Sequence, residues 1–163
     1  MTTASDPGFD LRSAGERAQL EAFLDEYRCR LPDRLDGLDE KQARRRIVPS
    51  KTTLLGLIKH MTFVENVWFN EAITGTPRNE LGPATPDASF TLTNGDNMAS
   101  IRDAHALTCA GSRERVANLS LDHVLHDRQG KALTVRFLFL QCIREYAHHT
   151  GHADIVREMA LTS

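Results

Sequence analysis

Two segments far apart in the chain hold most of the side chains that could carry out chemistry. The first ends at His60, and the second, from Glu145 to Asp154, contains three histidines. Residues four apart in an α-helix lie on one face, so Glu145 and His149 could bind the same ion. Metal sites in helix bundles draw ligands from several helices, and His60 is the leading candidate for a third. We therefore predict a divalent-metal site of His60, Glu145 and His149, with one position left for an exchangeable ligand.

The register of the last helical segment selects these ligands from among their neighbours. Its apolar residues recur with helical spacing, which places His149 near the centre of the inward face. Glu145 and His152 fall near the border of that face, and His148 points further out. A lone histidine beside an apolar stripe is ordinarily a hydrogen-bonded core residue, and an inward glutamate can simply pair with an arginine. The combination favours a metal, because a buried unpaired carboxylate is costly and a cation offsets that cost.

The types of ligand restrict the metal and suggest a catalytic neighbour. Imidazole suits zinc, nickel, iron and copper, and the carboxylate adds oxygen character. We expect zinc, with nickel, iron or manganese as alternatives. His152 is predicted to act in catalysis as a proton carrier, and the alternatives are a fourth ligand or a hydrogen-bond donor behind the ligands.

The other histidines and the cysteines are predicted to have no part in this site. His105, His123 and His126 have no helical partnership with the ligands, and we expect them on the surface or in loops. The three cysteines are widely spaced and form neither a CxxC motif nor a disulfide framework, which indicates reduced thiols in a cytoplasmic protein. Cys142 is expected to be a small core residue.

Length and composition indicate one globular domain that needs neither nucleic acid nor a membrane. The 163 residues are enough to bury a core, 40% of them are hydrophobic and the formal net charge is -2. No signal peptide and no run of membrane-spanning length is evident. We expect residues 1–163 to form a single domain, with residues 1–10 flexible.

Apolar spacing and capping signals predict four long helices that position the site. Their expected ranges, with a short helix at 39–46 in addition, are 11–31, 52–74, 96–118 and 134–159. Residues 75–95 contain three prolines and are expected to be a long irregular crossover beside a pocket. Residues 128–131 are expected to be a turn, with two short extended pieces as its possible flanks. The fold class is therefore all-α, a four-helix bundle with a long loop between its second and third helices and almost no strand.

The last helix also carries apolar residues outside its inward stripe. Phe137, Leu140 and Ile143 make it apolar almost all round, and such a helix is either central or covered by a partner. We expect a homodimer.

In the residues 54–61 and 145–158 the chain resembles the DinB/YfiT-like superfamily of metal-binding four-helix bundles. It is most similar to the DUF664 branch, which is related to the N-terminal domain of mycothiol-dependent maleylpyruvate isomerase. The resemblance implies an up-down-down-up bundle with a divalent metal near one end. Many superfamily members carry a histidine where this chain has Glu145, and the His, Glu, His set points toward the thiol-using branch.

These observations lead to a hypothesis about function and to two alternatives. The hypothesis is a divalent-metal-dependent thiol S-transferase that uses a low-molecular-weight thiol such as mycothiol on a small electrophile lodged under residues 75–95. Metal coordination lowers the pKa of a thiol, so that the thiolate forms near neutral pH. A metal-dependent hydrolase of the same fold, with water as nucleophile, is the first alternative. A non-catalytic metal-binding stress-response module is the second.

Overall fold

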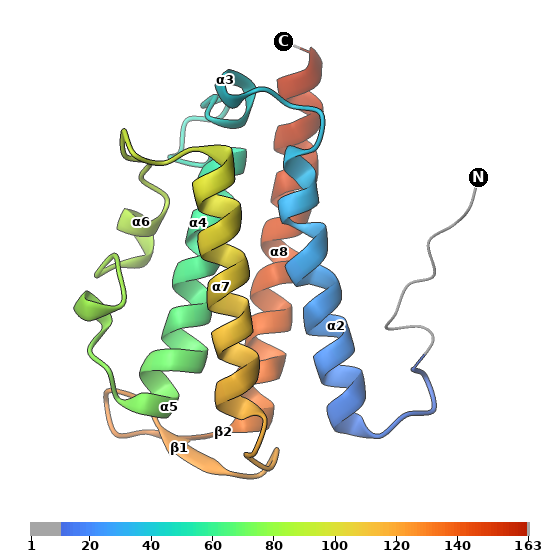
Figure 1. Ribbon diagram of the computed structural model, residues 1–163, viewed down its shortest axis with the longest axis vertical. Helices are drawn as coiled ribbons and strands as arrows, with labels where there is room; N and C mark the ends of the chain where they lie inside the picture. Colours follow the sequence, from blue (N-terminus) through green and yellow to red (C-terminus); the bar gives the residue numbers. More distant parts are fainter. Residues whose placement is uncertain (1–10, 163) are drawn as a thin grey trace.

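Four long helices form the frame of the fold in the computed structural model, which describes residues 11–162. They are α2 (Glu16–Arg30), α4 (Leu54–Glu65), α7 (Met98–Val116) and α8 (Val135–Thr162). The colours of Figure 1 show that α2 and α8 run in one direction while α4 and α7 run in the other, which confirms the up-down-down-up order. The helix α4 continues as a π-helical segment, η2 (Asn66–Glu71), and a last turn, α5 (Ala72–Thr74), which ends at Gly75 with φ 72°. The predicted flexibility of residues 1–10 concerns residues outside those described.

Capping side chains explain where these helices begin. Thr53 accepts a hydrogen bond from the backbone of Gly56 at the start of α4, and Asn97 forms a capping box at the start of α7. Thr134, the first residue of the range expected for the last helix, caps α8, since its hydroxyl accepts from Phe137 N at 3.3 Å. Several predicted boundaries were wrong: α2 begins at Glu16 instead of residue 11, α7 begins at Met98 instead of residue 96, and α8 ends at Thr162 instead of residue 159.

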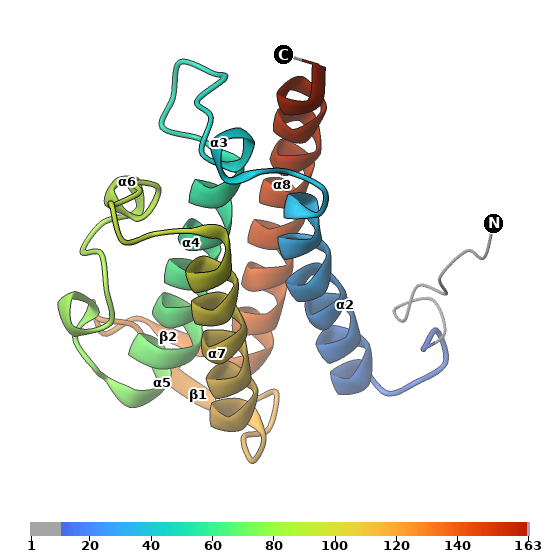
Figure 2. The same ribbon diagram turned by 45° about the horizontal axis from the view of Figure 1, so that its top comes forward.

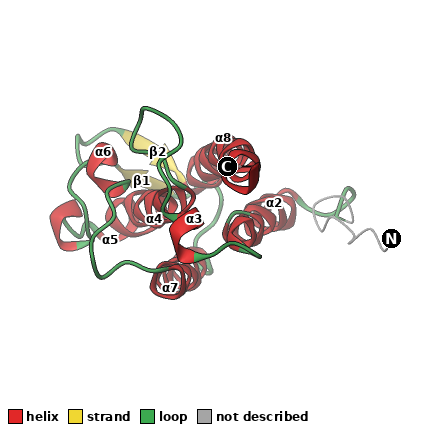
Figure 3. Ribbon diagram, turned by 90° about the horizontal axis from the view of Figure 1, so that it is seen from above, coloured by secondary structure: helices red, strands yellow, loops and turns green. Residues whose placement is uncertain are grey.

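Short elements connect the long helices and lie mainly to one side of α4. Figures 2 and 3 show the chain between α5 and α7 as a layer on the side of α4 that faces away from α2. The short elements are η1 (Pro32–Leu35), α3 (Glu40–Ala43), η3 (Arg78–Glu80) and α6 (Pro86–Ser89). The expectation that residues 75–95 lack regular structure was wrong at η3 and α6. In α6, Pro86 occupies the first turn and Thr85 caps the helix.

An antiparallel hairpin closes the end of the bundle at which α8 begins. It pairs β1 (Val124–His126) with β2 (Ala132–Thr134), in a register that places Leu125 opposite Leu133. The predicted turn with short extended flanks is therefore confirmed. This small sheet leaves the predicted all-α class unchanged.

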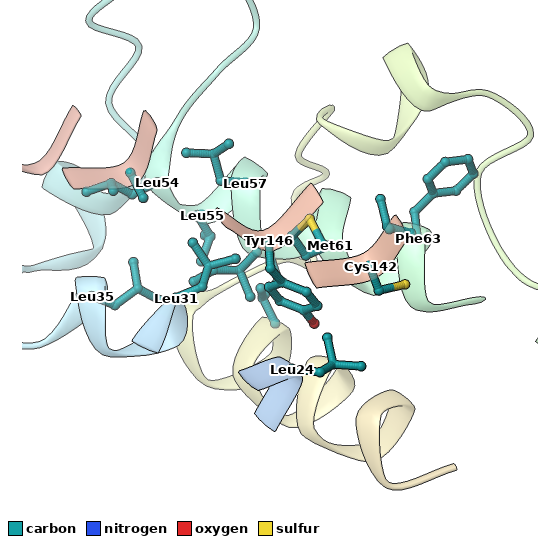
Figure 4. Packing of buried hydrophobic residues seen from close by; sticks show 14 of the residues in the cluster. Leu24, Leu31, Leu35, Leu54, Leu55, Leu57, Met61, Phe63, Cys142 and Tyr146 are labelled. Carbon is teal, nitrogen blue, oxygen red and sulfur yellow. The ribbon is translucent and has the colours of Figure 1, made fainter. Parts of the chain in front are cut away.

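The core lies between the long helices, and Figure 4 shows Tyr146 in its middle, between Leu24 of α2 and Met61 of α4. Cys142 is fully buried in the same cluster, as expected for a core residue. On the outer side of α8, Phe137 and Leu140 remain 45% and 52% exposed. The expected homodimer stays a prediction. Within residues 11–162, no helix has both the length and the apolar character that crossing a bilayer requires.

Candidate metal centre

The packing of α4 against α8 brings together the three predicted ligands. The ring centroids of His60 and His149 are 4.7 Å apart, with an edge-to-face angle of 72°. One turn earlier on α8, the Oε2 atom of Glu145 is 3.7 Å from His149 Nε2. His60 and Glu145 also line one cavity. The structure therefore places His149 next to both His60 and Glu145. Among the described residues, the group of three whose ligand atoms converge to within 4.8 Å is His148, His149 and His152, so metal binding by the predicted three stays a prediction.

The ring of His60 is fixed by Ser89, the last residue of α6, and by Phe90, which follows it. The Ser89 hydroxyl donates to the carbonyl of Pro86 at 2.6 Å, so its oxygen accepts from His60 Nδ1–H at 2.7 Å. Phe90 stacks on the same imidazole with a centroid distance of 4.0 Å. This hydrogen bond selects the tautomer whose Nε2 lone pair is free for a ligand bond, as in many metal-binding histidines.

A glycine in α4 permits the close approach of this segment. A Cβ at Gly56 would lie 2.9 Å from the carbonyl oxygen of Phe90 and 2.9 Å from the Thr53 hydroxyl that caps the helix. A contact this short would force the neighbouring atom to move, and the Phe90 oxygen is a backbone atom, which cannot move as cheaply as the end of a flexible side chain. Gly56 lies one turn before His60, so the missing side chain lets Phe90 and Ser89 reach the imidazole.

Burial keeps both imidazoles neutral at physiological pH. It lowers the pKa of His60 to about 3, with a further contribution from His149. It also lowers the pKa of His149 to about 4, and the neighbouring His148 and His152 add to this effect. Neutral imidazole is the form that binds metals.

The donor set fits a divalent cation. Among the described residues, none is a hydrogen-bond partner of the buried Nδ1 atom of His149. Gln141 Nε2 donates to Oε1 of Glu145 at 2.8 Å. The other carboxylate oxygen, Oε2, takes no part in that hydrogen bond and lies toward His149. Two neutral imidazole nitrogens and one carboxylate oxygen are a common donor set around zinc. The other nitrogen of His60 is hydrogen-bonded to Ser89 and the other oxygen of Glu145 to Gln141, as is usual for metal ligands.

A cavity of about 450 Å³ adjoins the site. Arg78 from the 75–95 segment pairs with Glu71 at 2.7 Å and lies over the ring of Phe63, which holds this segment on α4. The hairpin turn forms another wall. Besides His60 and Glu145, the cavity is lined by an apolar group and a polar group: Phe63, Val64, Val67, Trp68, Ala72 and Pro86, and then Glu71, Arg78, Asp127, Arg128 and Gln129.

The other two histidines of α8 lie on its outer side. His148 and His152 are both exposed, and their ring centroids lie 5.2 Å and 5.6 Å from that of His149. His152 is not among the residues that line the cavity described above. Its predicted catalytic role stays a prediction.

A buried ion pair behind the site fixes α8 against its neighbours. The guanidinium of Arg28 donates two hydrogen bonds of 2.8 Å to the fully buried carboxylate of Glu65, which holds the pKa of that carboxyl below its usual value despite burial. Tyr146, next to Glu145, donates to the same carboxylate at 3.0 Å. The expectation that His105 lies on the surface was wrong: it is 2% exposed, and its Nε2 atom is 2.8 Å from the Tyr146 hydroxyl. His123 and His126 are exposed, as expected.

Several residues of the site carried no signal in the sequence. Ser89 and Phe90 lie in a segment expected to be irregular, and the hairpin residues 127–129 were assigned only to a turn. The Thr85-Pro86 pair predicts a short helix start, yet nothing in the local pattern indicates that this helix packs against His60.

Comparison with known proteins places this chain in a family. The family model of mycothiol-S-transferase matches residues 19–160. The chain belongs to the mycothiol-S-transferase family. The match confirms the predicted relation to thiol-using DinB-like bundles, and the mycothiol-S-transferase family is one of mycothiol-dependent enzymes. No curated protein matches the chain.

A solved structure supports the same fold for this mycothiol-S-transferase family member. The chain is similar to a histidine-to-alanine mutant of mycothiol-dependent maleylpyruvate isomerase, with a TM-score of 0.55 and 18% sequence identity. The similarity covers 80% of this chain and 59% of that one. The chain thus spans about 59% of the length of the isomerase, and the likeness is one of fold.

Proposed function

We propose that this protein transfers a low-molecular-weight thiol, such as mycothiol, to a small electrophile with the help of a divalent metal ion. The observation that carries the proposal is the juxtaposition of His60, Glu145 and His149 beside a largely apolar cavity. Membership in the mycothiol-S-transferase family supports the choice of thiol.

Three side chains hold the ion in this proposal, and each is prepared for that task. His60 offers Nε2 because Ser89 occupies Nδ1, and Glu145 offers Oε2 because Gln141 occupies Oε1. Burial keeps the imidazoles of His60 and His149 uncharged. A bound zinc, nickel, iron or manganese ion supplies a Lewis acid that lowers the pKa of a thiol, so that the thiolate forms near neutral pH.

The cavity provides the place for the electrophile. Phe63, Val64 and Trp68 form an apolar wall that excludes water from the reacting sulfur, which favours attack by thiol over attack by water. Arg78 and Arg128 at the polar wall can bind an anionic or carbonyl group of the electrophile. The thiolate sulfur would form a bond to the electrophilic carbon while the bond from that carbon to its leaving group (chloride in a chloro-aromatic electrophile) breaks with its electron pair, and the proton of the thiol is released. His152 is the proposed carrier of that proton to solvent, because it is exposed and its ring is 5.6 Å from that of His149.

A conjugation assay tests this proposal with a defined probe. Mycothiol and 1-chloro-2,4-dinitrobenzene are mixed with zinc-loaded protein, and formation of the thioether is followed by its absorbance. We expect activity that a chelator removes and zinc restores, and that Glu145→Gln lowers by at least about 100-fold, as loss of a metal ligand does. The matched control is His123→Gln, an exposed histidine outside the site, which keeps the activity.

Each other outcome of this assay contradicts the proposal. Consumption of the electrophile at the same rate without thiol would support the hydrolase alternative. A melting temperature that falls on chelation, without any turnover to lose over a panel of thiols and electrophiles, would support the non-catalytic module. Full activity in the Glu145→Gln variant would remove the proposed ligand set.

A further inference from the structure

The outer side of α8 carries a pair of histidines that the proposed centre does not use as ligands. His148 and His152 lie one turn apart, and both are exposed. Their ring centroids are 4.3 Å apart, the shortest separation among the three histidine rings of this helix. Within residues 11–162, no hydrogen bond or ion pair occupies either ring, so their nitrogen atoms are free to bind a ligand.

The separation of these two rings suits one metal ion. Two imidazoles at positions i and i+4 of a helix can bind the same ion, as the paired histidines of HExxH helices do. The candidate ligand atoms of His148, His149 and His152 all lie within 4.8 Å of one another. Imidazole nitrogens prefer nickel, copper and zinc over the harder magnesium and calcium ions.

The interior of a long helix gives this pair a rigid frame. The helix α8 extends from Val135 to Thr162, so both residues are at least ten positions from either end. Gly151, which lies between them, has open space where a Cβ would stand, so no side chain covers the pair at that position. An ion bound here keeps water in its remaining positions, because the pair supplies only two protein ligands.

In this proposal His149 serves the inner centre, although its ligand atom also lies within 4.8 Å of those of His148 and His152. Its Nε2 atom lies toward Glu145, and its ring is in edge contact with His60. His149 is 12% exposed in its side chain, whereas its two neighbours are exposed to solvent. The four histidines therefore form an inner pair and an outer pair.

We propose that His148 and His152 form a second, solvent-exposed site for a divalent transition-metal ion, separate from the inner centre. It binds more weakly than the inner centre, because it has two protein ligands and no carboxylate. Both outer rings lie within 5.6 Å of the ring of His149, so an ion captured at the surface is held next to a ligand of the inner centre. The proposal stands on the outer pair alone and does not depend on the proposed thiol transfer. An ion bound there occupies the imidazole of His152, so His152 can act as the proposed proton carrier only while the outer site is empty.

Nickel binding by the chain without a histidine tag tests this site. The metal-free protein is titrated with Ni²⁺ at pH 7.5 by calorimetry, and bound nickel is counted by equilibrium dialysis. We expect two classes of site, of which His148→Gln weakens the second by at least about tenfold and leaves the first unchanged. His126→Gln is the matched control, because it removes an exposed histidine of β1 and should change neither class.

A further variant separates this proposal from the inner centre. His60→Gln is expected to weaken the first class only. If the inner centre binds no metal, the wild-type protein shows one class that survives His60→Gln and is lost in His148→Gln, and the outer site stands. A single class lost in both variants would mean one shared ion and would overturn the proposal. Nickel binding that is unaltered by His148→Gln would overturn it too.

Discussion

The hydrogen bond from His60 to Ser89 offers a sharp test of how the inner centre is built. Ser89 is fully buried, and its oxygen accepts from His60 Nδ1–H at 2.7 Å. In Ser89→Ala this imidazole N–H loses its acceptor inside the protein, which costs about 1–3 kcal/mol. Loss of such a partner behind a metal ligand lowers metal affinity by about 10–100-fold. That factor corresponds to about 1.4–2.7 kcal/mol of binding free energy.

A competition titration with a zinc chelator measures this effect. Zinc affinity is compared between wild type, Ser89→Ala and Ser112→Ala. Ser112 is the matched control, because it is 1% exposed, donates to the Thr108 carbonyl at 3.0 Å and lies in α7, which carries none of the proposed ligands; its hydroxyl also contacts the carboxylate of Glu65. Both variants should lower the free energy of unfolding, and only Ser89→Ala should lower zinc affinity. Equal zinc affinity in the two variants would refute the reasoning that Ser89 prepares His60 for metal.

Three further predictions concern the supports of the site. Gly56→Ala should destabilise the protein and weaken zinc binding, because the new Cβ would lie 2.9 Å from the Phe90 carbonyl oxygen. Gly151→Ala is the control: its Cβ would meet no atom, and the variant should gain up to about 1 kcal/mol in the free energy of unfolding. Urea melts that show a gain for both variants would contradict this. Glu65→Gln removes the buried counter-charge of Arg28 and leaves it only the partly exposed Asp25 at 2.9 Å; it should cost about 3–5 kcal/mol, measured as the free energy of unfolding in urea. A cost below about 1 kcal/mol would show that the ion pair is dispensable. Metal-free protein should lose stability as the pH falls from about 6.5 toward 4, by up to about 1.4 kcal/mol per pH unit for each imidazole of the inner centre. The sign follows because the folded-state pKa values, about 3 and about 4, lie below the unfolded value, so the unfolded state binds protons first. A flat profile of urea midpoints between pH 7 and pH 5 would be the contrary result.

The sequence predicted the frame of this molecule because its signals are local. Helical spacing of apolar residues and the stop at Gly75 required no knowledge of tertiary contacts. The register of the last helix was also local, and it correctly placed His149 inside and His148 outside. The convergence of His60 with that helix was a hypothesis from its residue type and its place beside an apolar stripe, because spacing alone does not say which helices pack together.

What the sequence did not predict depends on contacts between distant segments. His105 was expected on the surface, yet it is buried in the bundle, where its Nε2 atom lies 2.8 Å from the hydroxyl of Tyr146, 41 positions away in the chain. The contact of Phe90 with His60 depends on how residues 75–95 fold back on α4, and turn signals do not encode that path. The hairpin residues Asp127, Arg128 and Gln129 also line the cavity, and their position likewise depends on a contact between segments far apart in the chain.

The most direct test of the central claim is a crystal structure of zinc-loaded protein with anomalous data collected at the zinc edge. We expect an anomalous peak bonded to His60, Glu145 and His149 at about 2.0–2.2 Å, with one further position open to solvent or thiol. A peak bound only by His148 and His152, or no peak between α4 and α8 at full zinc loading, would contradict it.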